Sequence, residues 1–112
     1  MNVLIHNNKG GEWFNTGTHI TCYDQPNNKR FRRPTFRTDS ESRYGPNGAE
    51  EFIEWLNLPE VEMAPEVLHP YRGGKRTVLY QGEYYDLGKR SELIAFCEEL
   101  QKGGVINEIY HE

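Results

Sequence analysis

The chain has 112 residues, of which 36% are hydrophobic and 27% are charged, and its formal net charge is −4 at neutral pH. This length fits one domain, residues 1–112, with a single modest core. The sequence contains no run of about 18 apolar residues, which excludes a membrane-spanning helix of the usual kind. Seven tyrosines, five phenylalanines and two tryptophans predict a thin, aromatic-rich core that leaves some tyrosines at the surface.

Charge is distributed unevenly along the chain. Residues 1–45 carry seven basic and four acidic side chains, whereas residues 46–112 carry six basic and thirteen acidic ones. Such a bipolar chain suits partners of both signs. The first residues have neither the charged start nor the long apolar stretch of a secretory signal. The two cysteines are therefore expected to be free thiols in the reducing cytoplasm.

The first 45 residues predict short strands separated by turns. Residues 2–6 alternate weakly and end at the turn cluster Asn-Asn-Lys-Gly-Gly,. Residues 12–15 and 18–24 follow as strand, with a bulge expected at Gly17. Residues 29–38 predict a further strand, which Pro34 restricts to a sheet edge or an extended arm because proline has no N–H to donate.

A first amphipathic helix is expected after the polar loop of residues 39–48. Asn47 and Glu50 have the spacing of a capping box, in which each side chain binds the other residue's free backbone N–H. The helix itself has an apolar face and an acidic face, and Leu58-Pro59 is expected to end it. Residues 60–70 are an irregular crossing that could hold one short strand at 61–63. The apolar face comprises Ala49, Phe52, Ile53 and Leu56, and the acidic face comprises Glu50, Glu51 and Glu54.

The C-terminal third contains the clearest signals. Residues 77–80 and 83–86 flank Gln81-Gly82, a two-residue connection typical of a hairpin with a primed turn. Residues 89–102 predict a helix with a single apolar stripe, which Gly103-Gly104 ends. Val105, Ile106 and Ile109 then indicate a final strand. The stripe comprises Leu93, Phe96, Cys97 and Leu100, with Ile94 widening it.

This order of elements predicts an α+β fold. We expect an antiparallel β-sheet with the two amphipathic helices packed on one face. The hairpin, second helix and last strand would form a C-terminal ββαβ unit.

Residues 29–37 carry five basic and two aromatic side chains in nine positions. Basic groups interleaved with aromatic rings suit a nucleic-acid strand, where arginine neutralises phosphate and a ring stacks on a base. The same segment could dock on an acidic protein surface, or could simply be an edge strand whose charges prevent aggregation. The expected contact residues are Lys29, Arg30, Phe31, Arg32, Arg33, Phe36 and Arg37, which Arg72, Lys75 and Arg76 could extend.

No motif of catalysis, metal binding or cofactor binding is evident. Residues 72–77 resemble a phosphate loop only superficially, because the first glycine is missing and a strand follows where a helix is needed. His19 and Cys22 would lie on opposite faces of a strand, and Cys97 belongs to a core stripe. We therefore expect no cofactor and no metal. The glutamate pairs at 50–51 and 98–99 are typical of solvated helix faces.

These observations favour a small non-catalytic binding protein that regulates or inhibits a larger macromolecular machine through protein–protein contact. This size and style are typical of small regulators and of phage or mobile-element inhibitors of host defence. The alternative is a nucleic-acid-binding module using residues 29–37, although the net charge weakens its attraction to phosphate. A third possibility is an enzyme of unassigned type, because an active site assembled across a fold leaves no linear motif.

Overall fold

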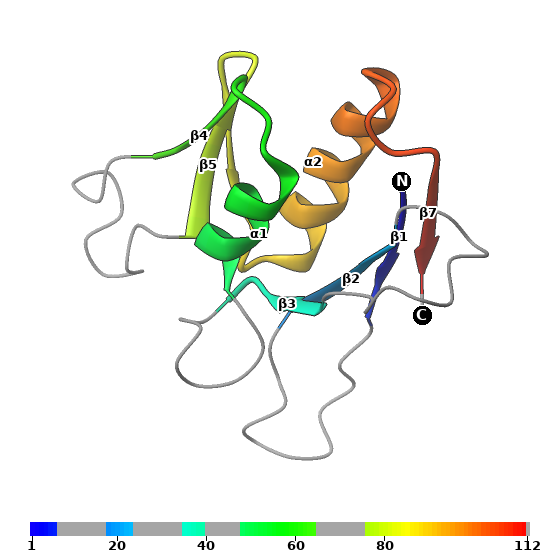
Figure 1. Ribbon diagram of the computed structural model, residues 1–112. Coiled ribbons are helices and arrows are strands. Elements are labelled where there is room, and N and C mark those ends of the chain that lie inside the picture. Colours follow the sequence, from blue (N-terminus) through cyan, green and yellow to red (C-terminus); the bar gives the residue numbers. More distant parts are fainter. Residues whose placement is uncertain (7–17, 24–34, 40–47, 65–75, 112) are drawn as a thin grey trace.

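The computed structural model describes residues 1–6, 18–23, 35–39, 48–64 and 76–111, and all structural statements below concern these residues. They form an α+β fold with strands in two sheets and two helices (Figure 1). The strands are β1 (Asn2–Ile5), β2 (His19–Tyr23), β3 (Thr35–Arg37), β4 (Val61–Met63), β5 (Thr77–Tyr80), β6 (Glu83–Asp86) and β7 (Glu108–His111). The helices are α1 (Ala49–Leu56) and α2 (Arg90–Lys102).

The first sheet has the strand order β3-β2-β1-β7. β1 pairs antiparallel with β2, and β2 pairs antiparallel with β3, whereas β7 lies parallel to β1. One face of this sheet is apolar, because alternate residues of each strand point to the same side. Its buried side chains are Val3, Ile5, Ile20, Cys22 and Phe36.

The second sheet, β4-β5-β6, is antiparallel and contains the predicted hairpin. Gln81 and Gly82 have φ angles of 51° and 80°. Positive φ at both central residues is the requirement of a type I′ turn, whose twist matches that of the strands it joins. The prediction of the hairpin is therefore confirmed, as is that of the short strand β4.

α1 has the expected faces but a different start. Ala49, Phe52 and Ile53 are buried, while Glu50 and Glu54 are exposed. The N-cap is Gly48, without a side-chain hydrogen bond, so the predicted capping box of Asn47 and Glu50 is wrong. The helix begins one residue too late for Asn47 to be its cap.

The ends of both helices are local features of the sequence. Asn57 ends α1 with a φ of 54°, the left-handed conformation that asparagine tolerates better than most residues,. After α2, Gly104 takes the positive φ of 81°. The expected stripe of α2 is confirmed, because Leu93, Phe96, Cys97 and Leu100 are all completely buried.

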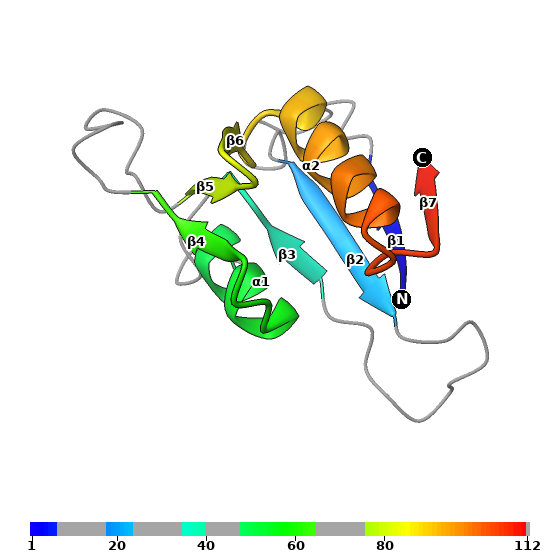
Figure 2. The ribbon, with the colours of Figure 1, turned by 90° about the horizontal axis from the view of Figure 1, so that it is seen from above.

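One hydrophobic core joins the two sheets and both helices. α2 lies over β1 and β2, and α1 lies beside β3 on the same side of the four-stranded sheet (Figures 1 and 2). The inner face of the second sheet closes the core, since Tyr80 and Tyr85 pack on Phe96 with ring centroids 5.8 and 5.6 Å apart.

Two expectations about the strands are wrong. The strands form two sheets in place of a single antiparallel one, and β7 pairs with β1 and not with the hairpin, so no ββαβ unit forms within one sheet. The 13 residues of α2 span about 20 Å at 1.5 Å each, enough to carry the chain from the second sheet to the first. The final strand also begins at Glu108, after Val105 and Ile106. The proposed strand at residues 12–15 lies outside the described residues, as do residues 29–34 of the strand expected at 29–38.

Candidate functional site

Only three of the ten predicted contact residues lie within the described part of the chain. They are Phe36 and Arg37 on β3 and Arg76 immediately before β5. The other seven, Lys29, Arg30, Phe31, Arg32, Arg33, Arg72 and Lys75, lie outside the described residues.

Phe36 belongs to the core. Its side chain is 1% exposed, and its ring lies 5.3 Å from that of Phe52 and 5.9 Å from that of Trp55. A ring packed this way cannot stack on a base or a partner, so the expected contact role of Phe36 is corrected. The signal was present in the sequence, since Phe36 is the apolar member of the alternating triplet Thr35-Phe36-Arg37.

Arg37 forms an ion pair with a neighbouring carboxylate. Its Nε donates a hydrogen bond of 2.9 Å to Oδ1 of Asp39, and both side chains are less than one-fifth exposed. A partner that uses Arg37 must therefore compete with Asp39. This requirement lowers the net gain from a new contact, because an existing charge-assisted hydrogen bond is lost.

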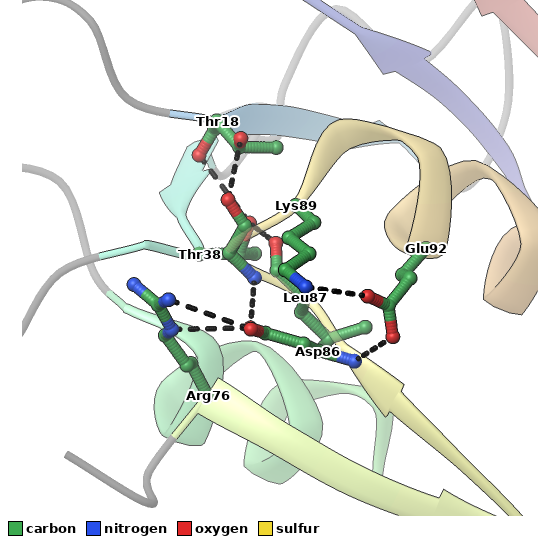
Figure 3. Close-up of polar contacts among 8 residues, drawn as sticks. Thr18, Thr38, Arg76, Asp86, Leu87, Lys89 and Glu92 are labelled. Atoms are coloured by element: carbon green, nitrogen blue, oxygen red, sulfur yellow. Dashed lines mark hydrogen bonds and ion pairs between the residues drawn. The ribbon is translucent and has the colours of Figure 1, made fainter. Parts of the chain in front are cut away.

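Arg76 is held by Asp86 in the second sheet (Figure 3). Its Nε lies 3.1 Å from Oδ1 of Asp86, and a terminal nitrogen donates to Oδ2 at 3.4 Å. The carboxylate also accepts the backbone N–H of Gly88 at 2.9 Å. Asp86 is only 4% exposed in its side chain, so its charge needs these donors, since a buried charge is stable only when paired.

The same region joins the two sheets through two threonines. Thr38 donates its backbone N–H to the carbonyl of Thr18 at 2.8 Å, and its hydroxyl lies within hydrogen-bonding distance of the carbonyl of Leu87. The hydroxyl of Thr18 donates to the carbonyl of Gly88 at 3.1 Å. We call this set of residues, Thr18, Thr38, Arg76, Asp86, Leu87 and Gly88, the junction (Figure 3).

The role of the junction is structural, because it connects the two sheets. Its threonine hydroxyls, the Asp86 carboxylate and the Gly88 N–H form hydrogen bonds that hold the end of β6 against the start of β2 and the end of β3. Arg76 Nε approaches Asp86 as an ion pair without a hydrogen bond. Sequence reasoning did not find it, because its members come from four separate stretches of the chain. The one local signal was the turn after Asp86, in which the carboxylate accepts the N–H two residues on, a common role of aspartate.

The described framework is strongly acidic. It contains five basic and twelve acidic residues, while eight of the thirteen basic residues lie outside it. Four of its five basic side chains are in ion pairs with framework carboxylates, and Arg90 donates to the carbonyl of His6. The framework therefore attracts cationic groups.

Three large aromatic side chains are exposed among the described residues. Trp55 on α1, Tyr84 on β6 and Tyr110 on β7 are 37%, 50% and 47% exposed. Exposed tyrosine and tryptophan are over-represented at the energetic centres of protein interfaces. Composition predicted that some tyrosines would remain at the surface, but not which ones.

Both cysteines are completely buried free thiols. Burial raises the pKa of Cys97 to about 12, and the neighbouring Glu98 acts in the same direction. The reactive thiolate of Cys97 is therefore scarce at neutral pH. Cys22 lies on the core face of β2, where its side chain contacts other buried residues.

We expect neither thiol to react with an aromatic disulfide reagent at pH 8 until the protein unfolds.

The free energy of unfolding should also fall as the pH rises from 9.0 towards 12, because the unfolded chain releases the Cys97 proton at a lower pH than the native chain does,. The loss can reach about 1.4 kcal/mol per pH unit. Rapid labelling of native protein would contradict this account, and Cys97→Ala should remove the corresponding part of the pH dependence.

No group of three or more histidine, cysteine, aspartate or glutamate side chains could hold a metal ion among the described residues. Within the same residues, no helix is long and apolar enough to cross a membrane. Comparison with protein-family models, with curated proteins and with solved structures found no match for this chain.

Proposed function

We propose that this protein is a small non-catalytic binding protein that regulates or inhibits a larger macromolecular machine by protein–protein contact in the cytoplasm. The observation that carries the proposal is the exposure of Trp55, Tyr84 and Tyr110 on an otherwise charged framework. These rings supply apolar contact area at a low cost in side-chain entropy, which is why interfaces use them.

Trp55 is the best-supported anchor of the three. Its ring packs on Phe36, which is itself held against Phe52, so one side of the indole is fixed by the core while 37% of the residue remains exposed. A side chain that is already ordered loses little freedom when a partner covers it. Glu54, its exposed neighbour on α1, favours a partner with basic groups beside its apolar contact,.

The second candidate function is nucleic-acid binding. It is favoured by the eight basic residues outside the acidic framework, among them Lys29–Arg33. It is disfavoured by the net charge of −4, which weakens long-range attraction to phosphate. Salt dependence separates the two, because four or five phosphate contacts on duplex DNA give a slope of log K against log salt of about −4.

Affinity capture with and without nuclease tests the proposed function. The immobilised full chain should retain a protein partner from its native cells after nuclease treatment. It should bind a 20-base-pair DNA and a 20-nucleotide RNA only weakly at low salt. Trp55→Ala should reduce the captured partner, with Glu98→Ala on the exposed side of α2 as the control for removal of an exposed side chain elsewhere. Nuclease-sensitive capture together with tight, salt-dependent binding of either nucleic acid would overturn the proposal.

A further inference from the structure

β7 is the open edge of the four-stranded sheet. It is the last strand in the order β3-β2-β1-β7, and Figure 2 shows it at the outer side of β1. The backbone N–H of His6 donates to the carbonyl of His19. The backbone N–H and C=O groups of Leu4 and His6 therefore face β2, and those of Val3 and Ile5 face β7,. In the parallel register, Val3 lies opposite Ile109. The backbone of Val3 therefore forms its hydrogen bonds with Glu108 and Tyr110, the residues on either side of Ile109,.

The backbone groups of Ile109 and His111 therefore point away from the sheet. The carbonyl of Glu108 and both groups of Tyr110 face β1, and the N–H of Glu108 is taken by the side chain of Asn2 at 3.2 Å. No hydrogen bond from the described part of the chain reaches the backbone of Ile109 or His111. Within the described residues, two donors and two acceptors thus point outward without a partner, and the two residues that carry them lie about 6.6 Å apart along the edge,.

Both edges of the second sheet are partly closed. On β6, the outward N–H of Asp86 binds the carboxylate of Glu92 at 2.9 Å, and its carbonyl accepts the N–H of Lys89. On β4, the N–H of Val61 binds the carbonyl of Leu58. Proteins commonly protect edge strands because an unpaired edge accepts another strand. The edge of β7 has no such closing bond within the described residues, so its geometry allows another strand to pair there,.

We propose, on the basis of the function proposed above, that the free edge of β7 binds an extended segment of the partner protein as an additional strand. Only an extended backbone matches the spacing of the free groups of Ile109 and His111. The segment would cover Tyr110, which is 47% exposed, and would carry a lysine or arginine beside the exposed Glu108. Cross-strand aromatic contacts and opposite charges stabilise such pairs.

A second copy of this chain is a less suitable occupant of the edge. Pairing β7 with itself would bring together two frameworks that each carry twelve acidic and five basic residues. Like charges would oppose that association. A basic segment of another protein would instead be attracted by the acidic framework.

Proline at position 111 tests the inference selectively. His111→Pro removes an outward N–H that the β1–β7 ladder does not use, and proline is tolerated on edge strands for this reason. His111→Ala is the matched control, because it removes the exposed imidazole and keeps the N–H. Both variants should melt within a few degrees of the wild type.

The probe is a 12-residue peptide selected from a random displayed library on the immobilised full chain. We expect a lysine- or arginine-containing peptide that binds the wild type and His111→Ala equally and binds His111→Pro about tenfold more weakly. Hydrogen exchange at the amides of Ile109 and His111 should slow when this peptide binds. Native proteins captured through the same edge should show the same pattern.

Three results would overturn the inference. A peptide that binds His111→Pro as well as the wild type, and protects amides elsewhere, would leave the proposed function intact but place the contact away from β7. A failure to select any peptide would show that the edge does not accept a strand. A dimer that His111→Pro dissociates, measured by sedimentation, would identify a second copy as the occupant.

Discussion

Phe96→Ala is expected to leave the protein largely unfolded. Phe96 is completely buried in α2, and its ring contacts Tyr80 and Tyr85 across the interface between α2 and the second sheet. Truncating a buried phenylalanine typically costs about 3–5 kcal/mol, because the apolar transfer energy is lost and a cavity remains. The free energy of unfolding of a small domain is only about 5–15 kcal/mol in total. Urea unfolding followed by far-ultraviolet circular dichroism measures the loss.

Glu98→Ala is the matched control for this variant. Glu98 lies on the exposed side of the same helix, and alanine is the better helix former, so the change should stay within about 0.5 kcal/mol. A Phe96→Ala protein with the melting temperature of the wild type would show that the core does not depend on the α2 stripe.

Asp86→Ala is expected to cost about 3–5 kcal/mol, the usual price of removing one partner of a buried ion pair. The substitution leaves Arg76 and the N–H of Gly88 without their acceptor. It also loosens the turn that holds Leu87 and Gly88 against Thr38 and Thr18. Arg76 is 26% exposed, so partial solvation makes the lower end of the range the expected value. The unfolding free energy from urea titration gives the comparison.

Gly88→Ala probes the same pair from the other side. A Cβ at position 88 would lie 2.8 Å from the Arg76 side chain, which must move and weaken its contact with Asp86. Overpacking of this kind costs about 1–3 kcal/mol. Gly103→Ala is the matched control, since its nearest neighbour would be 3.4 Å away. Equal stability of Asp86→Ala and the wild type would remove the junction from this account of the fold.

The elements that the sequence predicted well are those specified by neighbouring residues. The hairpin follows from Gln81-Gly82 between two apolar runs, and α2 follows from a stripe spaced at the helical period,. Both signals lie within a dozen residues and need no information about the rest of the fold. The apolar face of α1 was predicted for the same reason.

Strand partners could not be predicted in this way. Nothing in residues 108–111 specifies β1 as their neighbour, because the pairing is fixed by where α2 ends and by which edge is free. A short strand can satisfy its hydrogen bonds at either sheet, and tertiary packing decides between them. The prediction of Asn47 as the N-cap of α1 was wrong by one residue, because helix boundaries commonly shift by one or two residues.

The candidate contacts show the same limit. Five basic residues around Phe36 suggested one surface, yet the ring turns into the core and Arg37 pairs with Asp39. The junction was missed because Thr18, Thr38 and Asp86 are distant in sequence. Exposure of Trp55 and Tyr110 likewise depends on which neighbours cover them, which composition does not specify.

The sequence predicts that the basic segment 29–37 also contacts the proposed protein partner, and partner capture by a charge-reversed variant tests this claim most directly. The variant carries Arg30→Glu, Arg32→Glu and Arg33→Glu. A control with Lys9→Glu, Arg43→Glu and Lys102→Glu has the same net charge. Partner protein retained after nuclease treatment is quantified for both, with melting temperatures as the check on folding. We expect the variant to fold and lose the partner while the control retains it, and a folded variant that captures the partner as the wild type does would contradict the claim.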